Sequence, residues 1–134
     1  MSVTRYFLDT NILLYAAAET PGKTDTANAL IRQGGVVSIQ VLNEFVSVAS
    51  KKHRASWSRI DDLLAPTRYF CDVVSLTVAT HTKALSIAER HQLHIYDANI
   101  WAAAILAGCD TLYSEGMHAD LSIEGVTLKD PFAA

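Results

Sequence analysis

The segment that most constrains the fold of this chain is Tyr6–Tyr15, which reads Tyr-Phe-Leu-Asp-Thr-Asn-Ile-Leu-Leu-Tyr. It begins with a short apolar run typical of a β-strand and continues into an apolar run with helical character. Asp9 and Thr10 stand at the junction, where either can cap the helix. A strand that ends in a carboxylate and turns directly into a helix places that carboxylate at the carboxyl edge of a sheet, where ligands bind in open α/β folds. We therefore expect the rest of the chain to supply partners to Asp9.

The remainder of the chain alternates strand-like and helical segments. Strands are expected at residues 3–8, 36–39, 70–76, 111–113 and 126–128, with a brief extended piece at 94–96. Helices are expected at residues 10–18, 24–33, 40–52, 56–64, 77–90 and 98–107. The fourth helix should stop before Pro66, and Asp97 should start the last one. This alternation predicts one α/β domain, residues 1–134, with a mostly parallel central sheet flanked by helices.

Composition narrows the class of protein. Apolar residues make up 50% of the chain and charged residues 19%, which suits a compact core and argues against disorder. The two longest apolar runs are seven and eight residues, whereas a membrane span needs about 20. The first residues lack the apolar stretch of a signal peptide, so we expect a cytoplasmic protein. Cys71 and Cys109 are isolated in apolar surroundings and are expected to be buried, reduced thiols.

The charges are unevenly distributed, although the net charge is only −3. Basic residues dominate between positions 51 and 68, and acidic residues dominate after position 97. A basic region beside an acidic one suits a phosphate path that leads to a metal site, and solvated helix ends explain the basic region equally well. The residues that would steer a nucleic acid are Lys51, Lys52, Arg54 and Arg59.

Three carboxylates are expected at one edge of the sheet. Asp9 ends the first strand, Glu44 lies early in the helix after the second strand, and Asp97 begins the last helix. Right-handed crossovers would bring all three to the same carboxyl edge. Taken singly, Asp9 and Asp97 are explained as helix caps, whereas Glu44 borders the core with no Lys or Arg four residues away. Converging carboxylates require either protonation or a divalent cation, and oxygen ligands without His or Cys favour Mg²⁺ or Mn²⁺.

Four segments, in this order, resemble the motifs of the PIN-domain family and in particular those of VapC-like toxins: Phe7–Tyr15, Gln40–Phe45, Tyr96–Ala104 and Leu112–Glu115. The resemblance implies a three-layer, Rossmann-like fold. It also implies an Mg²⁺- or Mn²⁺-dependent endoribonuclease that hydrolyses RNA with a metal-activated water. Such a toxin would be a homodimer that a cognate antitoxin holds inactive. By motif position, Asp9, Glu44 and Asp97 are the catalytic metal ligands, and Asn11 and Ser114 support the site.

The chain departs from the family motif at Gly116, where such proteins usually carry a fourth acid. Glu115 is adjacent, but neighbouring side chains in an extended segment point to opposite faces, so it is no automatic replacement. Asp120 follows in the same loop. The departure leaves two hypotheses open. One is an attenuated ribonuclease, and the other is an inactive module that binds antitoxin or RNA without cleaving.

Two further interpretations concern partners and class. An antitoxin would need an apolar groove, and the candidates, which serve equally as core residues, are Leu13, Leu14, Trp57, Ile60 and Leu64. A receiver-type phosphoryl-transfer domain would require an Asp pair at the first strand and a lysine just after the last strands. Asp9 is instead followed by Thr10 and Asn11, which disfavours that class.

Overall fold

The central feature of the fold is a six-stranded, mostly parallel sheet with the strand order β3-β2-β1-β4-β6-β5. The computed structural model describes residues 5–117 and 120–133, and residues 3 and 4 of the expected first strand lie outside them. The strands are β1 (Tyr6–Leu8), β2 (Val36–Ser38), β3 (Asp72–Val74), β4 (Thr111–Tyr113), β5 (Ser122–Ile123) and β6 (Val126–Lys129). β5 alone runs antiparallel, against β6, and sequence analysis missed it because it is only two residues long.

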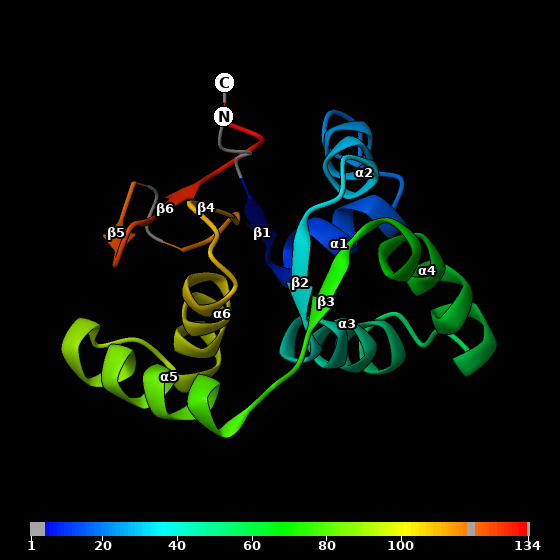
Figure 1. The fold of residues 1–134 in the computed structure, drawn as a ribbon. Helices are drawn as coiled ribbons and strands as arrows, with labels where there is room; N and C mark the ends of the chain where they lie inside the picture. Colours follow the sequence, from blue (N-terminus) through cyan, green and yellow to red (C-terminus); the bar gives the residue numbers. More distant parts are fainter. Residues whose placement is uncertain (1–4, 118–119, 134) are drawn as a thin grey trace.

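Helices cover both sides of this sheet (Figure 1). They are α1 (Thr10–Ala17), α2 (Thr24–Arg32), α3 (Ile39–Lys51), α4 (Trp57–Phe70), α5 (Val78–His91) and α6 (Ile95–Leu106). α5 and α6 pack against each other on one side, whereas α1, α2 and α4 group on the other. α3 follows β2 and touches α1, α4 and α6, so it lies where the two groups approach each other at the carboxyl edge. The expected α/β architecture is confirmed.

The core is built around β1 and α6. Phe7 and Leu8 of β1 are fully buried between β2 and β4, whose strands pair with β1 in parallel. In α6 every residue from Ala98 to Ala104 is buried, and all of them except Asn99 are apolar, as expected of a helix that is covered on all sides. The small alanines let this helix lie close to the sheet, and Trp101 fills the core beside them.

The expected end of the fourth helix before Pro66 is wrong, because α4 continues through Pro66 to Phe70. Pro66 removes one helical N–H at a cost of about 3 kcal/mol. Leu64 and Thr67 are nevertheless both buried, so the inward face of the helix continues on either side of the proline. Asp62, whose carbonyl lost its donor, is exposed to water. Tertiary packing outweighs the local signal, and the strand expected at 70–76 shrinks to β3.

The extended piece expected at residues 94–96 is also wrong. His94 is the N-cap of α6, and its Nδ1 accepts the Tyr96 backbone N–H at 3.0 Å. The helix begins at Ile95, so Asp97 lies within its first turn and is not its cap. The His94 imidazole supplies the capping acceptor that Ser or Asp normally provides, so the helix starts where an extended piece was expected. The cap expected at Thr77 for α5 is confirmed.

The expected burial of the two cysteines is confirmed. Cys71 and Cys109 are free and buried, and burial raises the pKa of each thiol to about 11. In the part of the chain that the structure describes, no helix combines the length and the apolar character that crossing a bilayer demands.

Candidate acidic active site

Asp9 lies at the end of β1, and the fold occupies both of its carboxylate oxygens. Oδ1 accepts the Thr10 backbone N–H at 2.7 Å, which makes Asp9 the N-cap of α1. Oδ2 accepts the Ser114 hydroxyl at 2.6 Å. Only 7% of the residue is exposed, and this burial raises the pKa of the carboxyl. The two hydrogen bonds oppose the rise, and the nearby Asp97 charge adds to it.

Glu44 approaches Asp9 from α3, and Asp97 approaches it from the first turn of α6. Glu44 is half-buried, and burial is the largest cause of its raised pKa. Gln40 donates to Glu44 Oε2 at 3.2 Å and lowers that pKa, whereas the charges of Asp9 and Asp97 raise it. The charge of Asp97 acts on Asp9, and the charges of Asp9 and Asp97 act on Glu44, so the three carboxylates lie in the same region although they are far apart in sequence. The structure thus brings together the acids that sequence analysis singled out.

Within residues 5–117 and 120–133 no Lys or Arg forms an ion pair with these acids, and the charge of His94 lowers the pKa of Glu44. All five ion pairs found there involve other carboxylates. Within the same residues, no three Asp, Glu, His or Cys side chains are gathered tightly enough to surround one ion as they stand. Asp97 and Glu44 are only half-buried, so they can turn toward Asp9. A group of oxygen donors without a Lys or Arg partner fits Mg²⁺ or Mn²⁺ in its chemistry.

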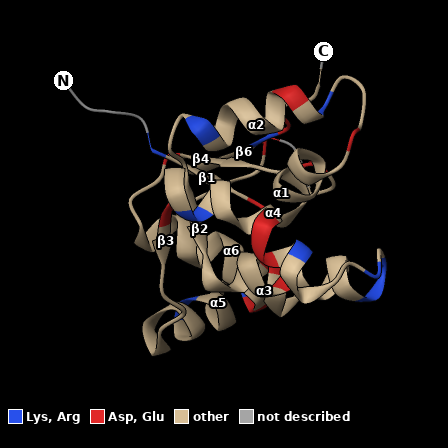
Figure 2. Ribbon diagram, turned by 90° about the vertical axis from the view of Figure 1, so that its right-hand side faces the viewer, with Lys and Arg blue, Asp and Glu red and all other residues tan. Residues whose placement is uncertain are grey.

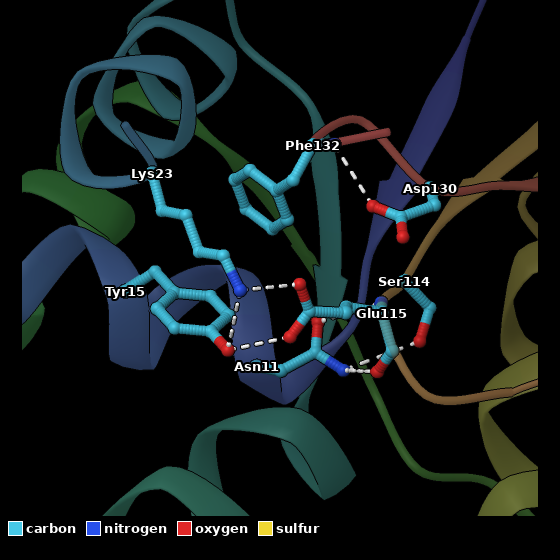
Figure 3. Close-up of polar contacts among 7 residues, drawn as sticks. All are labelled: Asn11, Tyr15, Lys23, Ser114, Glu115, Asp130 and Phe132. Atoms are coloured by element: carbon cyan, nitrogen blue, oxygen red, sulfur yellow. Dashed lines mark hydrogen bonds and ion pairs between the residues drawn. The ribbon is translucent and has the colours of Figure 1, made fainter. Parts of the chain in front are cut away.

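Asn11 contacts the turn after β4 through Ser114 and Glu115 (Figure 3), and Ser114 connects this turn to Asp9. The Asn11 amide nitrogen donates to Ser114 Oγ at 3.3 Å and to the Glu115 carbonyl oxygen. Its amide oxygen accepts the Glu115 backbone N–H at 3.2 Å. Ser114 is fully buried and donates to Asp9. These hydrogen bonds place both side chains beside the acidic group, and their supporting role stays a prediction.

The side chain of Glu115 bonds to a lysine and a tyrosine that sequence analysis did not single out. Lys23 Nζ lies 2.6 Å from Glu115 Oε2, and the Tyr15 hydroxyl donates to Oε1 at 2.5 Å. These hydrogen bonds lower the pKa of the Glu115 carboxyl. The sequence could have indicated Tyr15, because it lies one helical turn after Asn11 on the same face of the helix. Lys23 follows a Pro-Gly loop, and nothing in the sequence indicated its partner.

Gly116 has a backbone φ of +104°, in the region that favours glycine, and a Cβ built there meets nothing within 4 Å. It lines a cavity of about 330 Å³ together with His94, Asp97 and Trp101. Asp120 is exposed, and its N–H bonds to the Leu128 carbonyl at 3.0 Å. The charge of Asp120 does not contribute to the pKa shift of Asp9 or of Glu44.

The four basic residues expected to steer RNA lie at the end of α3 and at the start of α4. Lys51, Lys52 and Arg54 are exposed around the α3–α4 loop, which projects at the rim of the molecule (Figure 2). Arg59 is exposed on α4 and lines the cavities beside α1 and α3. Arg68, farther along α4, is neutralised by Asp61 at 2.6 Å. The unpaired basic charge in this region is therefore concentrated at the loop.

An apolar cavity of about 380 Å³ opens between α1, α3 and α4. Leu14, Ala17, Phe45 and Leu63 contribute to its lining, with Arg59 at the same cavity. The five residues expected to line an antitoxin groove lie partly in the core, partly at this cavity and partly on the surface. Leu13, Ile60 and Leu64 belong to the core, Leu14 lines the cavity, and Trp57 is 72% exposed.

Comparisons with known proteins agree with this architecture. The sequence profile of the PIN domain family matches residues 6–121, so the chain belongs to the PIN domain family. A toxin–antitoxin complex from Klebsiella pneumoniae is similar in structure, with 19% identity, coverage of 94% of this chain and 97% of that chain, and a TM-score of 0.71.

Two further solved structures are similar. VapC20 of Mycobacterium tuberculosis, a toxin that cleaves the sarcin-ricin loop, has 18% identity, coverage of 80% of this chain and 86% of that chain, and a TM-score of 0.65. VapBC2 of Rickettsia felis, bound to a DNA fragment from its promoter, has 22% identity, coverage of 94% and 98%, and a TM-score of 0.62. At these identities the likeness establishes the fold. A comparison with curated protein sequences gave no significant match.

Proposed function

We propose that this protein is the endoribonuclease toxin of a toxin–antitoxin pair and that Asp9, Glu44 and Asp97 hold Mg²⁺ or Mn²⁺. The single observation that carries the proposal is the group of carboxylates without a Lys or Arg partner at the carboxyl ends of β1 and β2, in a member of the PIN domain family. Similar structures that are toxins or toxin–antitoxin complexes support the biological setting. The proposal includes one domain over residues 1–134, a homodimer and a cytoplasmic location.

The chain's own residues perform the positioning in this mechanism. Ser114 and the Thr10 N–H fix the Asp9 carboxylate, so its geometry is set before RNA binds. Glu44 and Asp97 would hold the cation from α3 and α6. A divalent cation held there would lower the pKa of a water and neutralise charge on the phosphodiester. Because water is the attacking group, the products carry 5′-phosphate and 3′-hydroxyl ends.

The proposal predicts that cleavage of bulk RNA requires Mn²⁺ or Mg²⁺ and stops in chelator. It also predicts the direction of the pH dependence. The pKa values of Asp9 and Glu44 are raised, so these ligands protonate, and Mn²⁺ affinity falls, at a higher pH than for ordinary carboxyls, whose pKa is about 4. The measurement is cleavage and Mn²⁺ affinity between pH 8 and pH 5. Cleavage that persists in chelator, or that leaves 2′,3′-cyclic phosphates, would contradict the mechanism.

Replacing Gly116 with Asp should not restore a fourth ligand. The φ of +104° strains any side chain by about 1–3 kcal/mol, although the space around it is open. We expect cleavage within about 3-fold of the original chain, which corresponds to less than 1 kcal/mol. Gly116→Ala is the matched control, because it carries the strain without the carboxylate. A large gain by Gly116→Asp alone would show that the missing acid limits activity.

Neutralising the loop cations should weaken RNA binding and flatten its salt dependence. The variant replaces Lys51, Lys52, Arg54 and Arg59 with Gln, and the slope of log affinity against log salt should fall by about 0.7 for each lost phosphate contact. Arg68→Gln is the control, because Asp61 already pairs with that guanidinium. The measurement is RNA affinity in a salt titration. If the fourfold variant and Arg68→Gln have the same slope of log affinity against log salt, the loop residues do not contact RNA.

The same apolar cavity supports an antitoxin partner and the alternative function, an inactive module that binds antitoxin. The apolar cavity between α1, α3 and α4 offers the concave surface that an amphipathic helix of an antitoxin requires. This protein, which carries Gly116, can bind an antitoxin at that surface whether or not it cleaves RNA. Antitoxin binding without cleavage at any Mn²⁺ concentration would favour the inactive binding module.

A further inference from the structure

Four segments that are far apart in sequence meet around the ammonium group of Lys23 (Figure 3). Nζ lies 2.6 Å from Glu115 Oε2 and 3.2 Å from the Tyr15 hydroxyl. It also lies 4.5 Å from the centre of the Tyr15 ring and 5.6 Å from that of Phe132. The two rings pack edge to face, with their centres 5.1 Å apart. Lys23 thus ties α1 and the start of α2 to the segments that follow β4 and β6.

This cluster differs from an ordinary surface ion pair in its number of partners. The Lys23 and Glu115 side chains are 32% and 28% exposed, and both Glu115 oxygens are bonded. An isolated exposed pair contributes about 0–1 kcal/mol, whereas a connected set of hydrogen bonds and aromatic contacts restrains its members more strongly. The residue held most firmly is therefore Glu115, through both oxygens of its side chain.

The backbone of Glu115 carries this restraint to Asp9. Asn11 bonds both the N–H and the carbonyl oxygen of Glu115. The preceding residue, Ser114, has its N–H bonded to the Lys129 carbonyl at 3.1 Å and its hydroxyl bonded to Asp9 Oδ2 at 2.6 Å. A shift of this turn would move the Ser114 hydroxyl, and Asp9 would lose the donor that orients its second oxygen.

We propose that Tyr15, Lys23 and Glu115 form a latch that positions the Ser114 turn, and through it Asp9, for cation binding. Glu115 is then a positioning residue and not a substitute for the missing acid at position 116. The inference rests on the proposed function. It assigns a task to two residues, Tyr15 and Lys23, that lie outside the acidic group.

The test compares Lys23→Met with a matched removal of another lysine. Lys83 pairs with Glu124 at 2.8 Å with side-chain exposures of 25% and 38%, so Lys83→Met removes a similar ion pair on a different part of the molecule. Lys23 is the N-cap of α2, where a positive charge is unfavourable. A loss caused by Lys23→Met therefore does not come from weakening that helix. Lys23→Arg keeps the cation and serves as the rescue.

The two readouts are exchange of the Glu115 amide proton, followed by NMR, and Mn²⁺ affinity, followed by electron paramagnetic resonance. We expect Lys23→Met to speed the exchange and to weaken Mn²⁺ binding about 10-fold, the lower end of the range for residues that orient metal ligands. Lys83→Met should change neither, and Lys23→Arg should stay close to the original chain. If the Glu115 amide proton of Lys23→Met exchanges as slowly as in the original chain, the latch is excluded.

Faster exchange with unchanged Mn²⁺ affinity would overturn the positioning role. The failure of the proposed function looks different, because the unmodified protein would then bind no Mn²⁺ at all. In that case the role of the latch in positioning Asp9 for a cation is also excluded. Exchange of the Glu115 amide proton then shows only whether the Lys23–Glu115 pair holds the turn.

Discussion

Replacing Asp9 with Asn should reduce RNA cleavage about 1,000-fold, while raising the thermal stability of the metal-free protein. The loss follows because a metal contributes several kcal/mol to stabilising the reaction, and each 1.36 kcal/mol is a factor of ten. Asn retains an oxygen for the Thr10 N–H but no longer carries the charge that binds a cation. Its amide nitrogen can donate to Ser114, because a hydroxyl also accepts.

The gain in stability follows from the direction of the Asp9 pKa shift. The pKa is raised in the folded protein, so the charged form is less favourable there than in the unfolded chain. At pH 7 this lowers the free energy of unfolding, and the penalty disappears below the pKa of the unfolded chain. Asn carries no such penalty. Each kcal/mol regained raises the melting temperature by about 4 °C in a chain of this length.

The matched control for Asp9→Asn is Asp72→Asn, at the start of β3. Asp72 pairs with Arg5 at 3.1 Å on the surface, so its loss should leave cleavage unchanged and lower stability by at most about 1 kcal/mol. Calorimetry in chelator and cleavage in Mn²⁺ measure the two effects. If Asp9→Asn were active, or if it melted at a lower temperature than the original chain, the buried, uncompensated charge would not be the basis of the site.

Replacing Gly35 with Ala should destabilise the fold by about 1–3 kcal/mol, the usual cost of overpacking. A Cβ at this position would lie 2.5 Å and 2.9 Å from two Tyr6 ring carbons and 3.3 Å from Leu8 Cδ1. The Tyr6 ring cannot move freely. Its hydroxyl donates to the Leu30 carbonyl at 2.6 Å, and the ring packs edge to face on Tyr113 at 5.4 Å. Urea unfolding gives the loss directly.

A double-mutant cycle isolates this contact. In a Tyr6→Leu background the flexible side chain can make room, so Gly35→Ala should cost much less than it does beside tyrosine. Gly22→Ala is a useful comparison, because φ there is +80° but nothing lies within 4 Å of the added methyl group. An equal cost of Gly35→Ala in both backgrounds would exclude the Tyr6 ring as its cause.

The sequence predicted those parts of the site that depend on local patterns. An apolar strand followed by Asp9 and an apolar helix specified the junction and left Asp9 and Thr10 as the candidate caps, of which Asp9 is the cap. Glu44 bordered a helical apolar face, and its nearness to the other acids follows from the parallel order of β2, β1 and β4. Because parallel strands end at the same edge, correct topology was enough to gather the carboxylates.

Other features depend on contacts between distant segments and could not be predicted. α4 passes through Pro66 because Leu64 and Thr67 face the core on either side of it. His94 caps α6 with a side chain whose sequence context resembles a strand. The Lys23–Glu115 pair joins residues 92 positions apart, and neither its distance nor its direction is encoded in local spacing.

The most direct test of the account is a crystal structure of the protein with Mn²⁺, recorded with anomalous scattering. The account predicts one strong anomalous peak within coordination distance of Asp9, Glu44 and Asp97, with Glu115 still paired to Lys23. The same experiment on Asp9→Asn should show no peak there. A peak elsewhere on the protein, or none at saturating Mn²⁺, would contradict the claim that these three carboxylates form a metal site.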